Sequence, residues 1–217
     1  MEMNLVKNWY NEANGKKVVD ALIKNDFNAI YLSTKDEVAE FIMKNVQEGT
    51  KVGFGGSMTI TNMGIQSKVE AVKGIVFDHG RAHTPEETVA IAREELLSDL
   101  YLCSSNAVTL DGILVNVDGV GNRIAAMTFG PKKVIIVISV DKICKDEVAA
   151  FERLKYIAAP MNNKRLEKPN STNPCLKTGS CMDCHSKTRI CRVYSVMRRK
   201  PMMTDMTIII MGESSGF

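Results

Sequence analysis

The chain has 217 residues, of which 45% are apolar and 24% charged, as in a globular protein with a core of its own. Its formal net charge of +3 is too small to indicate a nucleic-acid partner. No apolar stretch is long enough to span a membrane or resembles a signal peptide, so we expect a cytoplasmic protein without a membrane span.

Helix-like and strand-like segments alternate along the chain, and this order predicts an α/β fold with a mainly parallel sheet. The clearest helix starts follow Thr34 and Thr84, because each threonine cap precedes acidic residues, and Pro85 strengthens the second start. In this second helix we expect four apolar side chains to face the core, namely Val89, Ala92, Leu96 and Leu97.

The expected strands cover 29–33, 51–54, 74–77, 100–103, a hairpin over 107–117 that turns at Asp111-Gly112, 132–140 and 206–211. The remaining expected helices cover 4–26 in two pieces, a segment that begins after Thr34, 59–69 and 141–158. We divide the chain into an α/β core over 1–159, a polar cysteine-bearing loop module over 160–201, and a final core strand with the C-terminus over 202–217.

Two glycine-rich loops are predicted ligand loops. The first lies between a strand and a helix, where backbone N–H groups and the helix N-terminus favour an anion; it contains Gly53, Gly55, Gly56 and Ser57. It is neither a Walker loop nor a dinucleotide fingerprint, and it is also compatible with a simple tight turn in which Ser57 or Thr59 caps the helix. The second follows the hairpin and contains Asp118, Gly121, Asn122 and Arg123, where the guanidinium could hold a phosphate or carboxylate. A turn in which Asp118 and Asn122 bond their own backbone is the alternative.

Because the carboxyl ends of parallel strands share one edge of a sheet, segments 53–57, 79–83 and 104–106 are expected to lie together, and Asn106 joins the predicted ligand set. The second glycine loop could reach the same edge. His79 and His83 are more typical of surface histidines in a polar loop than of a catalytic or metal-binding pair.

Four of the six cysteines form a C-x5-C-x2-C-x6-C run near the C-terminus, and they are Cys175, Cys181, Cys184 and Cys191. Four thiolates in one turn-rich segment can hold zinc or an iron–sulfur cluster, and the spacing matches no standard zinc-finger or ferredoxin run. Two disulfides or four free thiols are the alternatives, but a reducing compartment favours the metal or cluster.

The segments GFGGSMT at 53–59, SSNAVTLDG at 104–112 and NVDGVGNRIAA at 116–126 resemble the lactate-utilization (LUD) domain family, as do 129–134 and 211–217. The resemblance covers nearly the whole chain. It implies the three-layer α/β fold shared with ribose-5-phosphate isomerases, glucosamine-phosphate deaminases and CoA transferases. It also implies that both loops meet at the substrate, the matching positions being Gly55, Gly56, Ser57, Asn106, Asp118, Gly121 and Arg123.

The resemblance does not carry an activity over. The sequence contains no equivalent of the CoA-transferase catalytic glutamate, nor of the isomerase aspartate pair with its lysine. Family members linked to lactate oxidation act with iron–sulfur proteins, and several branches carry a similar C-terminal cysteine run.

Three functions follow from these patterns. The first is a component of a cytoplasmic L-lactate oxidation system, with an iron–sulfur cluster on the four cysteines, a small anionic ligand at the glycine loops and other lactate-oxidation proteins as partners. The second is a transferase- or isomerase-like enzyme acting on a phosphorylated or acyl substrate, with a structural zinc. A zinc-stabilised nucleic-acid or protein-binding module ranks last, because the basic C-terminal part has almost no aromatic residues for base stacking.

Overall fold

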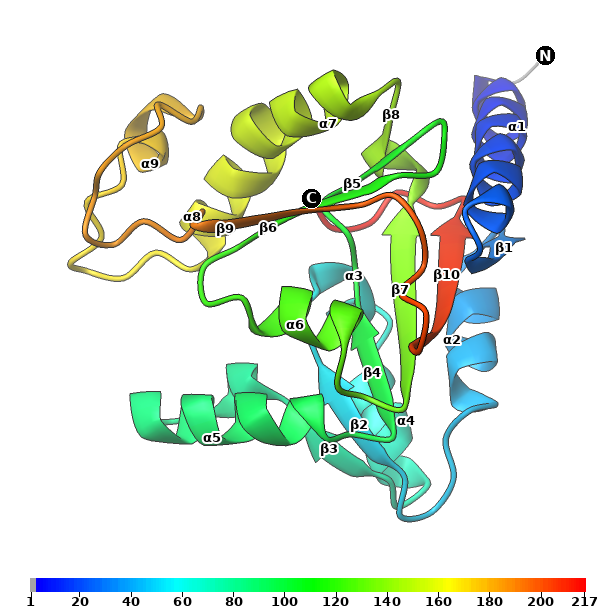
Figure 1. Cartoon of the computed structure of the whole chain (residues 1–217), viewed down its shortest axis with the longest axis horizontal. Coiled ribbons are helices and arrows are strands. Elements are labelled where there is room, and N and C mark those ends of the chain that lie inside the picture. The colour runs from blue at the N-terminus through cyan, green and yellow to red at the C-terminus, as the bar shows by residue number, and fades with distance from the viewer. Residues whose placement is uncertain (1–2) are drawn as a thin grey trace.

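A six-stranded, all-parallel sheet forms the centre of the computed structural model, which describes residues 3–217 (Figure 1). In spatial order its strands are β1 (Asn28–Leu32), β10 (Asp205–Met211), β7 (Lys133–Ser139), β4 (Leu100–Cys103), β2 (Lys51–Phe54) and β3 (Ile75–Phe77). The last strand of the chain therefore lies between the first strand and β7. The predicted α/β fold with a parallel sheet is confirmed.

A second, four-stranded sheet lies across one face of the large one. Its order is β8 (Ile143–Cys144), β5 (Ala107–Thr109), β6 (Leu114–Asp118) and β9 (Val193–Met197). β5 and β6 form the predicted hairpin, and Gly112 takes the positive φ of +80° that its turn requires. The second sheet itself is a finding of the tertiary structure, because β8 and β9 lie in segments that we expected to be helix and loop.

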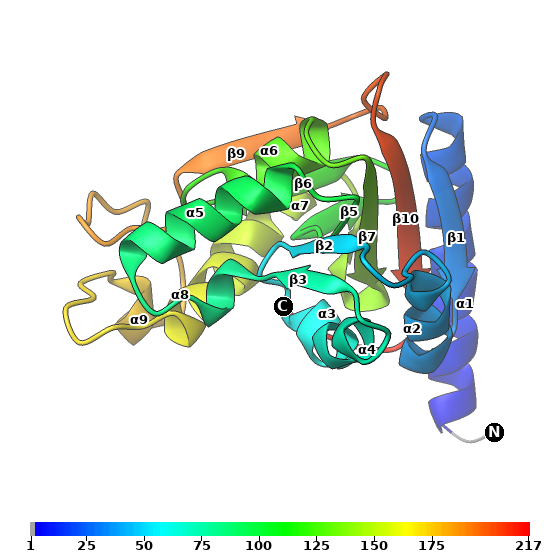
Figure 2. The ribbon, with the colours of Figure 1, turned by 90° about the horizontal axis from the view of Figure 1, so that it is seen from below.

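Helices cover the faces of both sheets (Figure 2). One face of the large sheet packs against α2, α3 and α4; the other carries α1, α5, α6 and the small sheet, whose outer face packs against α7. The helices are α1 (Met3–Lys24), α2 (Lys35–Met43), α3 (Met58–Thr61), α4 (Ile65–Ala71), α5 (Pro85–Leu96), α6 (Asn122–Thr128), α7 (Glu147–Arg153), α8 (Ala159–Arg165) and α9 (Cys175–Thr178). Within residues 3–217, no helix combines the length and the apolar character that a membrane span requires.

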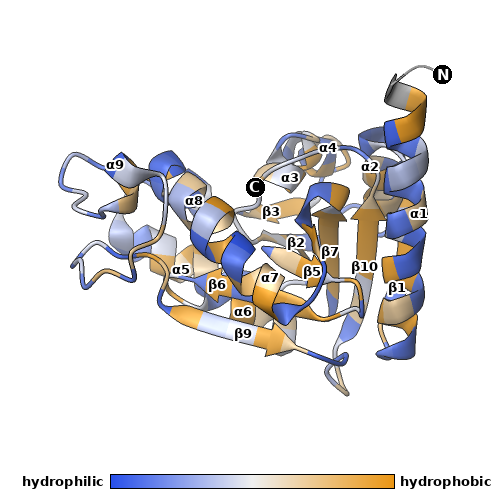
Figure 3. Ribbon diagram, turned by 90° about the horizontal axis from the view of Figure 1, so that it is seen from above, coloured by the Kyte–Doolittle hydropathy of each residue, from blue (hydrophilic) through white to orange (hydrophobic). Residues whose placement is uncertain are grey.

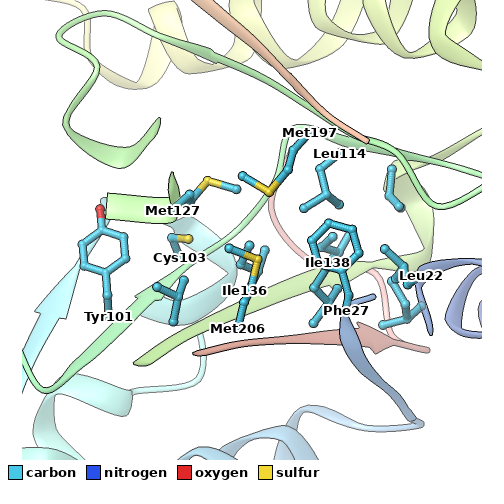
Figure 4. Packing of buried hydrophobic residues seen from close by; sticks show 14 of the residues in the cluster. Leu22, Phe27, Tyr101, Cys103, Leu114, Met127, Ile136, Ile138, Met197 and Met206 are labelled. Carbon is cyan, nitrogen blue, oxygen red and sulfur yellow. The ribbon is translucent and has the colours of Figure 1, made fainter. Parts of the chain in front are cut away.

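The main core lies between the two sheets. Figure 4 shows Met127, Ile136 and Ile138 in this layer, with Leu114 and Met197 of the small sheet packed over the strands of the large one. β7 and β10 are buried on both faces, which explains their continuous apolar sequences. Figure 3 shows this contrast, since β7 and β10 are hydrophobic while the loops beside α9 are largely hydrophilic.

Several boundaries differ from the sequence predictions for local reasons. α1 is one helix rather than two pieces. The helix expected over 59–69 is split into α3 and α4 by Gly64, which adopts φ +64°. The helix expected over 141–158 starts later, at Glu147, and continues through a π-helical turn (Leu154–Ala158) into α8. The stretch 160–201 therefore contains most of α8, the short α9 and strand β9 of the small sheet, and its loop-rich part is 166–192.

The start of α5 is as predicted, with Thr84 accepting a hydrogen bond from the backbone N–H of Glu87. Its predicted core face is only partly correct, since Leu96 packs against the core and Ala92 is half-buried. Val89 and Leu97 are exposed, and the residue that α5 buries is Glu95, which is 1% exposed. The physical reason is that α5 covers the edge of the sheet beside Gly53, where Glu95 binds a histidine at the end of the neighbouring strand.

Candidate functional site

The carboxyl ends of the parallel strands border one cavity of about 220 Å³. We call it the glycine-loop cavity. It is lined by Gly55, Gly56, Ser57, Met58, Thr59, His79, Ser104, Ser105, Asn106, Gly119, Val120, Asn122, Arg123, Lys142, Asn162, Arg165, Leu166, Gly216 and Phe217. Both predicted glycine loops therefore reach one cavity together with Asn106. Three predicted ligand residues do not line it, namely Gly53, Asp118 and Gly121.

The first glycine loop needs glycines for space and for backbone conformation. A Cβ on Gly55 would lie 2.6 Å from the hydroxyl oxygen of Tyr101, and Gly56 adopts φ +67°. Ser57 caps α3, since its Oγ accepts a hydrogen bond from the N–H of Ile60 at 3.4 Å. Gly53 lies within β2 and does not line the cavity; its lack of a side chain allows β2 to pack closely against Glu95 of α5.

Arg123 is held by oxygen atoms of the protein itself. Its Nε and Nη2 donate to Oδ1 of Asp118 at 3.0 and 2.6 Å. Nη1 donates to the carbonyl oxygen of Ser104 at 2.7 Å, and Nη2 also reaches Oδ1 of Asn106 at 2.6 Å. With these donors engaged, the guanidinium clamps the second glycine loop to residues 104–106 after β4, and its predicted hold on a ligand stays a prediction.

Asp118 and Gly121 set the backbone conformation of the second glycine loop without lining the cavity. The Oδ2 of Asp118 accepts a hydrogen bond from the N–H of Ile124 at 2.8 Å, and Gly121 begins α6 with φ +90°. Asp118 is buried, where an unpaired charge would be costly, and its ion pair with Arg123 compensates that charge. Gly119, Val120, Asn122 and Arg123 are the members of this loop that line the cavity.

Lys142 is a cavity residue that the sequence predictions missed. It follows β7, is 3% exposed, and its Nζ donates to Oγ of Ser104 at 3.0 Å. Burial, reinforced by the positive charges of Arg153 and Arg123, lowers the pKa of this amine to about 7. The available signal was its position directly after a buried strand, the same signal that placed Ser104 and Asn106.

His79 also lines the cavity, in contrast to our expectation of a surface histidine. Its Nδ1 lies 2.7 Å from Oε1 of the buried Glu95, and this hydrogen bond raises the pKa of the imidazole. A Cβ placed on Gly56 would lie 3.5 Å from Nε2, so the other ring nitrogen faces the glycine loop. A histidine oriented by a carboxylate is a common arrangement for proton transfer. His83 is exposed and does not line the cavity.

The cavity is positively charged. Lys142, Arg123 and Arg165 line it, while the carboxylates nearest to it are already engaged, Asp118 by Arg123 and Glu95 by His79. Arg165 comes from α8 and is oriented by Asn162, whose Oδ1 accepts from Nε and Nη2 at 3.0 and 2.8 Å. This arrangement favours a small anion.

The four cysteines of the C-terminal run line a second, small cavity. Cys191 is buried, and the other three are partly exposed. Burial raises the pKa of Cys175 and of Cys191. In this conformation no three His, Cys, Asp or Glu side chains among residues 3–217 are grouped closely enough to hold a metal ion. We call residues 175–191 the cysteine segment.

Hydrogen bonds shape the cysteine segment around its thiols. Arg189 donates to the carbonyl oxygens of Cys184 and Cys191, each at 2.7 Å. The backbone N–H of Asp183 lies 3.4 Å from Sγ of Cys181, and Asp183 itself has a positive φ of +46°. One N–H group directed at sulfur and a turn between the two cysteines of a C-x2-C pair fit the chemistry of a thiolate-bound centre.

Helix α8 separates the two cavities. Asn162 and Arg165 line the glycine-loop cavity, and Ala159 and Asn163 line the cysteine cavity. A second link runs through the backbone, because the N–H of Arg192 donates to the carbonyl oxygen of Asp118 at 2.9 Å. Figure 1 shows α8 and α9 together at one end of the molecule.

Comparisons with known proteins agree with this architecture. The sequence profile of the LUD domain matches residues 15–211. The fold is similar to that of a DUF162 family protein from Deinococcus radiodurans, with a TM-score of 0.51 and 14% identity over 92% of this chain and 98% of that one. eIF2B beta from Chaetomium thermophilum gives a TM-score of 0.35 and 16% identity over 52% of this chain and 43% of that chain. A comparison with curated proteins found no match. The family profile covers nearly the whole chain, so this protein belongs to the LUD-domain family.

Proposed function

We propose that this protein is a component of a cytoplasmic L-lactate oxidation system. In this proposal the glycine-loop cavity binds a small carboxylate, and Cys175, Cys181, Cys184 and Cys191 hold an iron–sulfur cluster. The observation that carries the proposal is the shared wall, since α8 presents Arg165 to a positively charged cavity and Asn163 to the four cysteines. Membership of the LUD-domain family supports the assignment to lactate utilization.

The chain's own residues have clear parts in this proposal. Arg165 supplies positive charge for a carboxylate, and the glycine loop supplies backbone N–H groups. His79, oriented by Glu95, is placed to accept a proton from a bound hydroxyl group. A cluster bound to the four thiolates would supply one-electron transfer, and other iron–sulfur proteins of the system are the expected electron partners.

The test is to purify the protein without oxygen and to measure iron, acid-labile sulfide and zinc. We expect iron and sulfide in comparable amounts, and loss of both in Cys184→Ser. Binding of lactate and pyruvate is then measured by calorimetry, with Asn162→Ala and Arg165→Gln as cavity variants and Lys177→Gln, in the cysteine segment, as the matched surface control. Protein with neither metal, or without affinity for either carboxylate, would contradict the proposal.

One observation favours a second function. The His79–Glu95 pair at a cavity for anions suits a transferase- or isomerase-like enzyme on a phosphorylated or acyl substrate, with zinc on the four cysteines as a structural ion. Colourless protein with one zinc per chain, and tighter binding of sugar phosphates than of lactate, would support this alternative over the first.

A further inference from the structure

Lys142 has a position that charge balance alone does not explain. Its Nζ lies at the end of β7, inside the protein, and it donates to a neutral hydroxyl group, Oγ of Ser104. Within residues 3–217 it forms no salt bridge, because the adjacent Asp141 binds Ser214 instead. A Cβ on Gly216 would lie 3.5 Å from Nζ, so the C-terminal segment covers the amine. A buried amine that lines a cavity and lacks a carboxylate is suited to act as a nucleophile.

We propose that Lys142 forms a reversible imine with a 2-oxo acid in the glycine-loop cavity, which would thereby recognise the oxidised, carbonyl form of its ligand. The class of ligand follows from the cavity. Arg165 and the glycine-loop N–H groups can bind a carboxylate, and Lys142 lines the same space. A volume of about 220 Å³ suits a small molecule. The carboxylate class rests on the proposed function, whereas the covalent step goes beyond it.

The environment of the amine supports its neutral form. The groups that face it are Arg153 of α7, Arg123 of α6, Asp141 beside it, and Cys103 and Ser104 at the end of β4. Burial and the two arginines lower its pKa to about 7, so a large share of Lys142 is unprotonated at neutral pH, unlike an exposed lysine.

The chemistry balances without an oxidant or a reductant. The lone pair of Nζ forms a bond to the carbonyl carbon, and the carbonyl oxygen takes up a proton to give a carbinolamine. Loss of that oxygen as water leaves the C=N bond of the imine, and addition of water reverses the sequence. Ser104 Oγ, 3.0 Å from Nζ, can pass the proton that nitrogen releases, and His79 can exchange a proton with the departing oxygen.

The test is trapping with sodium cyanoborohydride, which reduces an imine to a stable secondary amine. The protein is incubated with pyruvate and the reductant at pH 7, and intact mass and peptide mapping locate the adduct. We expect one adduct per chain, on Lys142. Lys145, three residues further on and exposed, provides the matched control: Lys145→Arg should retain the adduct and Lys142→Arg should lose it. Peptide mapping of the wild-type chain identifies the site even if Lys142→Arg folds poorly.

Two further measurements, one with acetone and one of the pH dependence, distinguish this inference from the proposed function. Acetone, which has a carbonyl but no carboxylate, should give at least tenfold less adduct than pyruvate. The rate of trapping with pyruvate should rise as the pH increases through about 7, and level off above it. Pyruvate that binds in calorimetry but gives no adduct on Lys142 would overturn the imine and leave the proposed function intact. Failure of pyruvate and lactate to bind at all would overturn both.

Discussion

The glycine-loop cavity and the cysteine segment share α8, yet they are held in different ways. The cavity borders the ends of paired strands in the large sheet, and Arg123 forms a buried ion pair with Asp118 and hydrogen bonds to Ser104 and Asn106. The cysteine segment contains one short helix, α9, and is otherwise loop, shaped by side-chain bonds such as those of Arg189. One region is positioned by the core, and the other lies outside it.

This difference indicates where a ligand is needed for order. Hydrogen bonds between protein groups, such as those of Arg123 and His79, hold the cavity walls in place, so the cavity is preformed. The four thiols of the cysteine segment line one small cavity, but among residues 3–217 no three of them are grouped closely enough to hold a metal ion, and thiolates drawn together there would repel one another. We therefore expect the cysteine segment, and not the cavity, to depend on a metal or cluster for its stability.

The largest effect that would test this comparison is the loss of bound metal. Replacing Cys181 or Cys184 by Ser should reduce iron and zinc to background, because four ligands are needed to close the shell. The unfolding temperature of the α/β core should change little. Metal analysis and calorimetry check both parts. Cys144→Ala, which alters a cysteine outside the segment, is the control and should retain the metal. A Ser variant with full metal content would contradict the ligand set.

The next test compares how much one arginine of each region contributes to the free energy of unfolding: Arg123 at the cavity and Arg189 in the cysteine segment. Arg123→Ala should lower the free energy of unfolding by about 3 kcal/mol, because it leaves the buried Asp118 without its partner. Arg189→Ala should lower the same quantity by less than about 1 kcal/mol, since the cysteine segment can open locally. Urea denaturation measures both. Equal losses would show that the cysteine segment is part of the cooperative core.

Lys142→Met should stabilise the protein by roughly 1–4 kcal/mol at pH 6, the range for replacing buried charges with apolar side chains. The pKa of Lys142 is lowered to about 7 in the folded protein, so folding releases its proton above that value. Wild-type stability therefore gains from rising pH between about 7 and 10.5, and the advantage of the variant should shrink over that range. Denaturation at pH 6 and pH 9 checks this; a constant difference would contradict the lowered pKa.

The smallest effect concerns two glycines with nearly the same backbone conformation. Gly56 has φ +67° in the cavity loop and Gly179 has φ +70° in the cysteine segment. Gly56→Ala should cost about 1 kcal/mol of global stability, the strain of a left-handed alanine. Gly179→Ala should leave global stability nearly unchanged and weaken metal retention instead. Thermal denaturation and metal content measure the two outcomes, and a reversed pattern would refute the comparison.

Much of the fold was predictable because its signals are local. The strand pattern of 132–140, the caps at Thr34 and Thr84, and the Asp111-Gly112 turn depend on neighbouring residues, and the structure confirms them. The meeting of both glycine loops was predictable for a topological reason, since carboxyl ends of parallel strands share an edge. The second sheet was not, because β8 has two residues and β9 pairs with a strand about eighty positions earlier.

The sequence by itself determined the alternation of helices and strands along the chain, the family, the two glycine loops and the run of four cysteines. Only the tertiary structure decided which side chains face the cavity. Glu95 is a charged residue for which the sequence predicts exposure, yet it is buried because it forms a hydrogen bond with His79, which lies on a different element. Lys142 acquires its low pKa, and Arg123 its clamp, from groups that are distant in sequence. Charge and hydrogen bonding act through space, so a residue's chemical role depends on neighbours that only folding supplies.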